Sequence, residues 1–66
     1  MNIQLNGQLQ EVADNTTLTA LLESMELYGR RIAVEVNEEL VSRSRFGSHQ
    51  LNEGDVVEIV QAIGGG

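Results

Sequence analysis

The sequence predicts a two-layer α+β fold, in which one helix packs on a mixed sheet of four or five strands. Three observations support this: an alternating segment and tight turn at the N-terminus, one stretch of helical periodicity, and several alternating segments in the second half. A sheet face and a helix stripe that are both apolar must be buried against each other. The 66 residues are expected to form one domain, residues 1–66, with a small core.

The N-terminal residues predict a β-hairpin. Apolar and polar residues alternate over residues 2–6, which is typical of a half-buried strand. Asn6-Gly7 follows, and both residues tolerate the positive φ of a two-residue hairpin turn. Residues 8–13 are the returning strand. Leu9 and Val12 differ in parity, so one of them lies off the core face or the strand carries a bulge.

The next segment predicts a single helix. Residues 14–17 offer several side-chain oxygens that can cap a helix N-terminus. Apolar residues then recur with the spacing of one helical face, namely Leu18, Leu21, Leu22 and Met25. Gly29 is expected to cap the C-terminus. Arg30 and Arg31 suit the negative end of the helix dipole.

The second half predicts three further strands around a long polar loop. The strands are expected at residues 32–36, 39–41 and 56–63. Phe46 is expected to fill the core beneath the loop, and residues 52–55 form a turn. In the last strand, Val57 and Ile59 face the core. The predicted order is β-β-α-β-β-β.

The composition excludes several kinds of site. The chain has no cysteine, no lysine and one histidine, so it cannot form a disulfide, a thiolate metal site or a Schiff base. His49 and Tyr28 belong to no recognisable set of nucleophile, base and orienting group. No catalytic residue and no metal site are therefore predicted, and the protein is not expected to be an enzyme.

The net charge and the N-terminus indicate the environment. The formal net charge is −6, which argues against binding to nucleic acid or to an anionic membrane. It favours solubility or attraction to a basic partner surface. No basic segment followed by a long apolar run is present, so neither a signal peptide nor a membrane span is expected. The predicted location is cytoplasmic.

The sequence ends in Gly64, Gly65 and Gly66. Three glycines weaken any strand or helix that they join, so residues 63–66 are expected to form a flexible tail that presents the α-carboxylate of Gly66. The alternative is a frayed end without function. A carboxylate is a poor electrophile, and the chain has no phosphate-binding loop for ATP. Activation of this group must therefore come from a partner.

Several segments together resemble one family. They are the Asn6-Gly7 hairpin and residues 33–41, 43–46, 54–60 and 61–66, in a chain of this length. In this order they resemble the small bacterial sulfur carriers with the ubiquitin-like β-grasp fold, specifically the ThiS carriers of thiamin biosynthesis. The resemblance covers nearly the whole chain. Gly65 and Gly66 match the family's functional di-glycine, whereas Gly64 is an additional glycine.

The resemblance implies a function as a co-substrate. A ThiF-like adenylyltransferase would use ATP to activate Gly66, and a persulfide from a cysteine desulfurase would convert it to a thiocarboxylate. A ThiG-like thiazole synthase would then receive the sulfur. The chain itself would bind no cofactor.

Partner binding is expected at apolar residues that the pattern leaves outside the core, which are Leu40, Val56, Val60, Ala62 and Ile63. Five acidic residues could face arginines of a partner or form a generic solvated rim; they are Glu35, Glu38, Glu39, Glu53 and Glu58. Three alternatives remain open. They are a carrier for molybdopterin synthesis, a ubiquitin-like modifier of other proteins, and a binding module with an inert tail.

Overall fold

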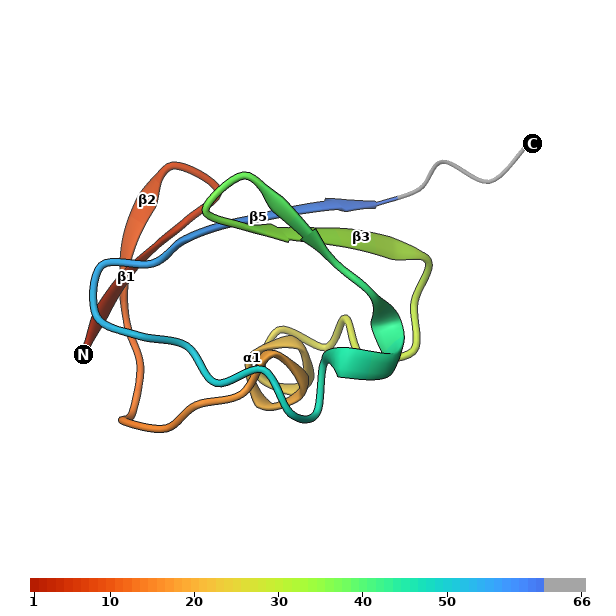
Figure 1. The fold of residues 1–66 in the computed structure, drawn as a ribbon, viewed down its shortest axis with the longest axis horizontal. Helices are drawn as coiled ribbons and strands as arrows, with labels where there is room; N and C mark the ends of the chain where they lie inside the picture. Colours follow the sequence, from red (N-terminus) through yellow and green to blue (C-terminus); the bar gives the residue numbers. More distant parts are fainter. Residues whose placement is uncertain (62–66) are drawn as a thin grey trace.

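The computed structural model describes residues 1–61, and its elements follow the predicted order (Figure 1). They are β1 (Asn2–Leu5), β2 (Gln8–Glu11), α1 (Leu18–Ser24), β3 (Ile32–Val36), β4 (Glu39–Val41), a 3₁₀ helix (Arg43–Arg45) and β5 (Val56–Gln61). The 3₁₀ helix lies in the expected polar loop. β2 is shorter than predicted, and the part of the predicted last strand beyond Gln61 lies outside the described residues.

The strands form one mixed sheet in the order β2-β1-β5-β3-β4. β1 and β5 are parallel, and the other three pairs are antiparallel. The first and last strands therefore lie side by side in the middle of the sheet. Helix α1 crosses beneath one face, and no element of residues 1–61 covers the other face (Figure 1). This arrangement confirms the predicted α+β fold with one helix on a mixed sheet of five strands.

Two tight turns set the register of the outer strands. Asn6 and Gly7 have φ of 50° and 83°, and Asn37 and Glu38 have φ of 52° and 69°. Positive φ at both central residues matches the twist of an antiparallel hairpin. Leu5 accordingly pairs with Gln8, and Val36 pairs with Glu39.

The core lies between α1 and the inner sheet face. Ten apolar side chains are buried there: Ile3, Leu18, Leu21, Leu22, Val34, Val36, Phe46, Leu51, Val57 and Ile59. Phe46 is 5% exposed, which confirms its predicted place beneath the loop. Val12 packs against this cluster while Leu9 is 74% exposed, so Leu9 is the residue of β2 that lies off the core face.

Helix α1 begins as predicted but ends earlier. The Thr17 hydroxyl accepts a hydrogen bond from the Ala20 amide at 3.1 Å, which is the expected N-cap. At the other end, the amide of Leu27 donates to the Leu22 carbonyl at 2.8 Å and that of Glu26 donates to Glu23 at 3.0 Å. These two bonds form a Schellman motif.

The predicted cap at Gly29 is therefore wrong. The left-handed position of the motif is occupied by Glu26, with φ of 60°, and Gly29 lies in the following turn. The physical reason is the half-buried Leu27, which packs against the core. A contact between the residue after the cap and the last helical turn commonly accompanies this motif.

Glu26→Gly is expected to stabilise the protein by up to about 1 kcal/mol, because glycine adopts positive φ without the strain that a Cβ introduces. Thermal unfolding followed by circular dichroism measures the change. Glu23→Gly, inside the same helix, is the matched control and should lose about 1 kcal/mol. An equal loss in both variants would show that the helix does not end before residue 26.

No helix in residues 1–61 is both long enough and apolar enough to span a membrane.

Candidate partner-binding site

The site is built on β5, which leads to the C-terminal glycines. Its pairing with β3 continues to Gln61, which lies opposite Ile32. Two asparagine side chains hold the strand further: Asn6 Oδ1 accepts from the Ile59 amide at 2.8 Å, and Asn37 Oδ1 accepts from the Val56 amide at 2.9 Å. The end of β5 is therefore fixed relative to the rest of the sheet.

A buried carboxylate anchors the start of β5. Asp55 is 8% exposed. Its Oδ1 accepts from the Asn37 side-chain amide at 3.0 Å, and its Oδ2 accepts from the Asn52 amide at 2.8 Å. A buried charge is tolerated when hydrogen bonds replace its hydration. The sequence indicated a turn here, but it did not reveal that Asp55 ties the β3–β4 hairpin to β5.

The side chains of β5 alternate between the two faces of the sheet, as predicted. Val57 and Ile59 are buried against the helix layer, whereas Val56 and Val60 are 37% and 62% exposed on the opposite side. Leu40 of β4 is 71% exposed. These placements agree with the apolar positions that sequence analysis left outside the core. The other predicted site residues, Ala62, Ile63, Gly64, Gly65 and Gly66, lie outside the described residues.

The exposed apolar residues share the uncovered face of the sheet with a pair of acidic residues. Glu58 lies directly opposite Glu35, and the next pair on the same face of these strands is Val60 opposite Ala33. On the β4 side of β3, Leu40 lies opposite Glu35. On the other side of β5, Val56 pairs with Gln4 of β1, and Gln4 pairs with Leu9 of β2. We call this surface the outer sheet face, defined by Leu9, Glu35, Leu40, Val56, Glu58 and Val60.

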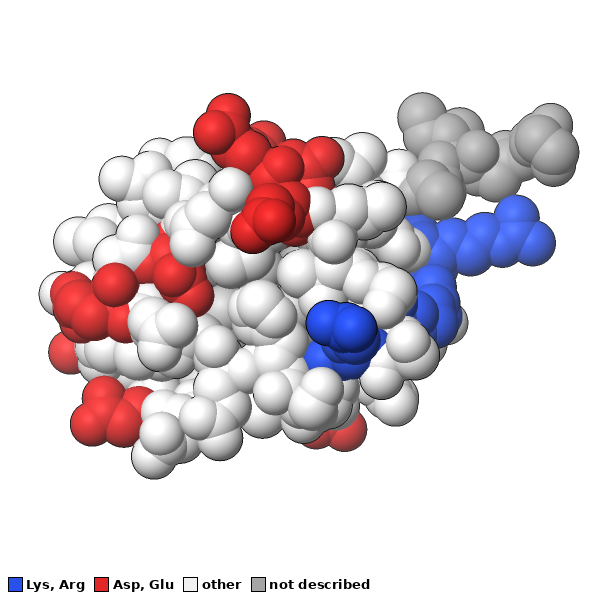
Figure 2. Space-filling model, in the orientation of Figure 1, with Lys and Arg blue, Asp and Glu red and all other residues white. Residues whose placement is uncertain are grey.

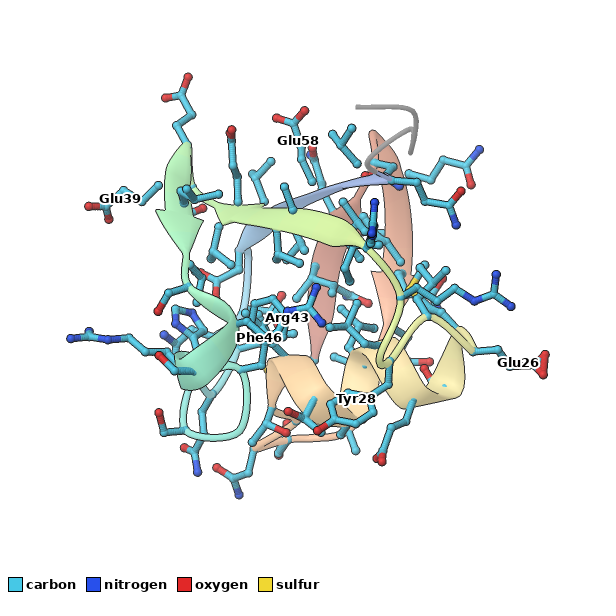
Figure 3. All side chains as sticks on the ribbon, turned by 90° about the vertical axis from the view of Figure 1, so that its right-hand side faces the viewer. Glu26, Tyr28, Glu39, Arg43, Phe46 and Glu58 are labelled. Carbon is cyan, nitrogen blue, oxygen red and sulfur yellow. The ribbon has the colours of Figure 1, made fainter. Side chains whose placement is uncertain are left out.

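The charge on the outer sheet face is one-sided. Like charges directly opposite each other on neighbouring strands are destabilising, and Glu35 and Glu58 are such a pair. Figure 2 shows acidic side chains gathered over this part of the sheet, and Figure 3 shows Glu58 pointing away from α1. An exposed apolar surface with central carboxylates suits a partner that offers apolar and basic side chains.

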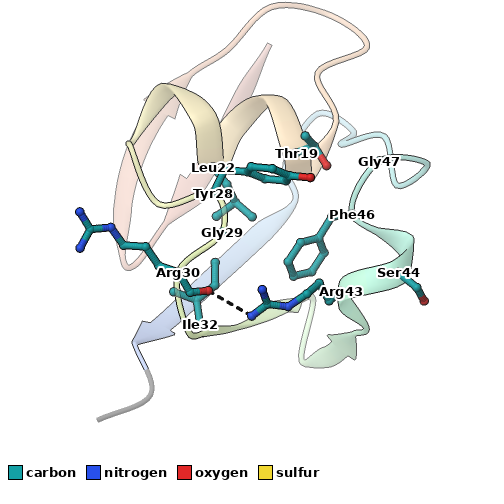
Figure 4. A pocket seen from close by; sticks show the side chains of 10 residues that line it. All are labelled: Thr19, Leu22, Tyr28, Gly29, Arg30, Ile32, Arg43, Ser44, Phe46 and Gly47. Atoms are coloured by element: carbon teal, nitrogen blue, oxygen red, sulfur yellow. Dashed lines mark hydrogen bonds between the residues drawn. The ribbon is translucent and has the colours of Figure 1, made fainter. Parts of the chain in front are cut away.

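A pocket of about 300 Å³ lies at another part of the surface, between α1, the 3₁₀ helix and the segment joining α1 to β3 (Figure 4). Tyr28 and Phe46 contribute rings to its lining, and Arg43 Nη2 donates to the Arg30 carbonyl at 3.1 Å across one side. His49 lines a different hollow, with Glu39 and Arg45. The structure therefore does not bring Tyr28 and His49 together.

Comparisons with known proteins identify relatives along the whole chain. The family model described as the ThiS family matches residues 3–66. A sulfur carrier protein ThiS from Bacillus subtilis is 37% identical over 65 residues, covering 97% of this chain and 98% of that protein. A thiazole synthase from Magnetococcus marinus is 41% identical over 66 residues, and this chain spans only 20% of its length.

A solved structure gives the same result for the fold. The crystal structure of the thiamine biosynthesis protein ThiS from Geobacter metallireducens superposes with a TM-score of 0.86 at 32% identity, covering 100% of both chains. The shared fold includes the sheet whose central strand leads to the glycines. The match of sequence and structure over the full length shows that this chain belongs to the ThiS family of sulfur carrier proteins.

Proposed function

We propose that this protein carries sulfur for thiazole formation in thiamin biosynthesis, as a co-substrate and not as an enzyme. The observation that carries the proposal is the family match, which runs through residue 66 and so includes the C-terminal glycines. The relatives include carriers of this length and a thiazole synthase that contains a similar segment. Those names favour the thiazole pathway over molybdopterin synthesis.

The proposed chemistry takes place at the carboxylate of Gly66. One carboxylate oxygen attacks the α-phosphorus of ATP on a ThiF-like adenylyltransferase, and pyrophosphate leaves. A persulfide derived from a cysteine desulfurase then attacks the acyl carbon, and AMP leaves. A thiol cleaves the resulting acyl disulfide, which releases the thiocarboxylate and leaves a new disulfide on the sulfur donor. A ThiG-like thiazole synthase is the proposed acceptor of this sulfur.

The placement of β5 supports this use of the terminus. The strand is held by β3 as far as Gln61, so the remaining residues start from a fixed point. An extended chain covers about 3.3–3.6 Å per residue, and the five residues that follow therefore reach at most about 18 Å. A terminal glycine has no Cβ, so no side chain shields the acyl carbon from attack.

The outer sheet face is the proposed docking surface for the activating enzyme. It carries exposed Val56, Val60 and Leu40 around the Glu35–Glu58 pair. Partner side chains that are apolar at the edges and basic at the centre would bury the valines and relieve the repulsion between the carboxylates. Ala62 and Ile63 continue the proposed surface in sequence, towards the glycines.

Val60→Asp is expected to leave folding intact and to weaken binding to the activating enzyme at least about tenfold, because it places a third carboxylate in the apolar part of the docking surface. Isothermal titration calorimetry measures the binding, and circular dichroism checks the fold. Gln10→Asp, exposed on β2 with its side chain away from the outer sheet face, is the charge-matched control. Unchanged binding by Val60→Asp would place the interface elsewhere.

Intact-mass measurement tests the proposed function itself. The full chain is incubated with the adenylyltransferase, ATP and a persulfide donor. The expected product has one oxygen replaced by sulfur, and thiazole synthase should consume it. A larger protein adduct would instead indicate a ubiquitin-like modifier, and an unchanged mass would indicate an inert tail. If the enzyme of molybdopterin synthesis consumes the thiocarboxylate and thiazole synthase does not, the choice of pathway is reversed.

A further inference from the structure

The positively charged side chains of this acidic protein are confined to one end. The chain has four arginines and no lysine. Two of them, Arg30 and Arg31, end the segment between α1 and β3, and the other two, Arg43 and Arg45, lie in the 3₁₀ helix. Figure 2 shows the basic side chains in the half of the molecule where β5 ends. We call these four residues the basic end.

The topology brings Arg31, one residue of the basic end, next to the last residue of β5. Arg31 immediately precedes Ile32, which pairs with Gln61. Arg43 is joined to the same segment because its Nη2 donates to the Arg30 carbonyl at 3.1 Å (Figure 4). Two segments that are distant in sequence therefore present arginines in the half of the molecule where β5 ends, and Arg31 lies beside the residue that pairs with Gln61.

Within residues 1–61, these arginines form no ion pair with a carboxylate; the ion pair found there joins the N-terminal amine to Asp14. Arg30 Nε donates to the Glu26 carbonyl at 3.2 Å, and Arg43 makes the bond described above. The side chains of Arg31 and Arg45 donate no hydrogen bond to any group in residues 1–61. All four arginines are exposed. Internal packing therefore does not account for the basic end.

We propose that the basic end binds an acidic surface of the activating enzyme, beside the site that receives the tail. This inference rests on the proposed function. The chain would present a negative surface on the outer sheet face and a positive surface at the end of the molecule from which the tail continues. A partner with the opposite pattern would be attracted over a distance and held in one orientation. That orientation would direct the glycines to the nucleotide.

Association kinetics test this proposal on the full chain and the adenylyltransferase. The test variant is Arg31→Gln/Arg45→Gln, which spares the two arginines that hydrogen-bond within the fold. The control is Gln8→Glu/Gln10→Glu on β2, which changes the net charge equally but far from Gln61 along the sheet. At low ionic strength the test variant should associate about tenfold more slowly than wild type, with a weaker dependence on salt. The control should stay within about twofold.

The possible outcomes separate this inference from the proposed function. If wild type gains no thiocarboxylate, the proposed function fails. If wild type gains it and both variants associate alike, only the role of the basic end is overturned. If the arginine variant associates at the wild-type rate but the KM for ATP is raised, the arginines contact the nucleotide phosphates. That result also overturns the proposed role of the basic end. Circular dichroism spectra that match wild type establish that each variant is folded.

Discussion

Deletion of Gly65 and Gly66 should abolish thiocarboxylate formation and leave the fold unchanged. Within residues 1–61, the ten buried apolar side chains lie between Ile3 and Ile59, and the described pairing of β5 ends at Gln61. The truncated protein therefore keeps its core and its docking surface. It loses the terminal glycine whose carboxylate is proposed to react and about 7 Å of reach. Circular dichroism, thermal unfolding and ATP–pyrophosphate exchange with the adenylyltransferase measure these effects.

A matched variant separates the reach of the tail from its chemistry. Gly66→Ala keeps the length and the terminal carboxylate but adds a Cβ next to the acyl carbon. We expect it to retain part of the exchange activity, while the deletion retains none. The truncated protein ends in the carboxylate of Gly64, so normal exchange by it would show that Gly65 and Gly66 are not required and would contradict the assignment of Gly66 as the reactive residue.

Leu21→Ala should cost about 2–4 kcal/mol of unfolding free energy, the usual cost of a cavity in a packed core. Leu21 is 3% exposed and lies on the buried stripe of α1. A domain of this size has a total stability on the order of 5 kcal/mol, so the variant would lose much of it. Val57→Ala, at a fully buried position of β5, is expected to fall in the same range.

Chemical denaturation and thermal melting measure this loss, and a melting temperature at least about 10 °C below wild type is expected for Leu21→Ala. Leu9→Ala is the matched control, since it removes the same atoms from a side chain that is 74% exposed. It should change the stability by less than about 0.5 kcal/mol. Equal losses in the two variants would contradict the assignment of faces in α1 and β2.

Most of the elements could be predicted because their signals are local. Period-2 alternation in residues 32–36 and 56–61 and the helical stripe that begins at Leu18 identify a strand or a helix without any long-range information. The Asn6-Gly7 turn is equally local, because its residues determine which φ values cost little energy. The exposed sides of Val56 and Val60 followed from the same alternation.

The end of the helix could not be predicted in this way. Gly29 has the lower intrinsic cost in a left-handed cap, so local preference favours it over Glu26. The structure places Glu26 there because Leu27 packs against the core at the end of α1. Tertiary packing of one apolar side chain therefore outweighed the local preference. Leu9 and Val12 are a second example. Their alternation did not show which of them faces the core, and the structure shows that Val12 contacts it.

The sequence by itself determined the kinds of residue available: a terminal di-glycine, no thiol, no lysine, and an acidic chain whose cations are all arginines. These are properties of composition and order, and folding does not change them. Only the tertiary structure decided which residues became neighbours. The parallel pairing of β1 with β5, the Glu35–Glu58 pair and the approach of Arg31 to Gln61 depend on strand order and register. Those are fixed when the helix and the sheet bury their apolar faces together, which is a property of the whole chain and of no single segment.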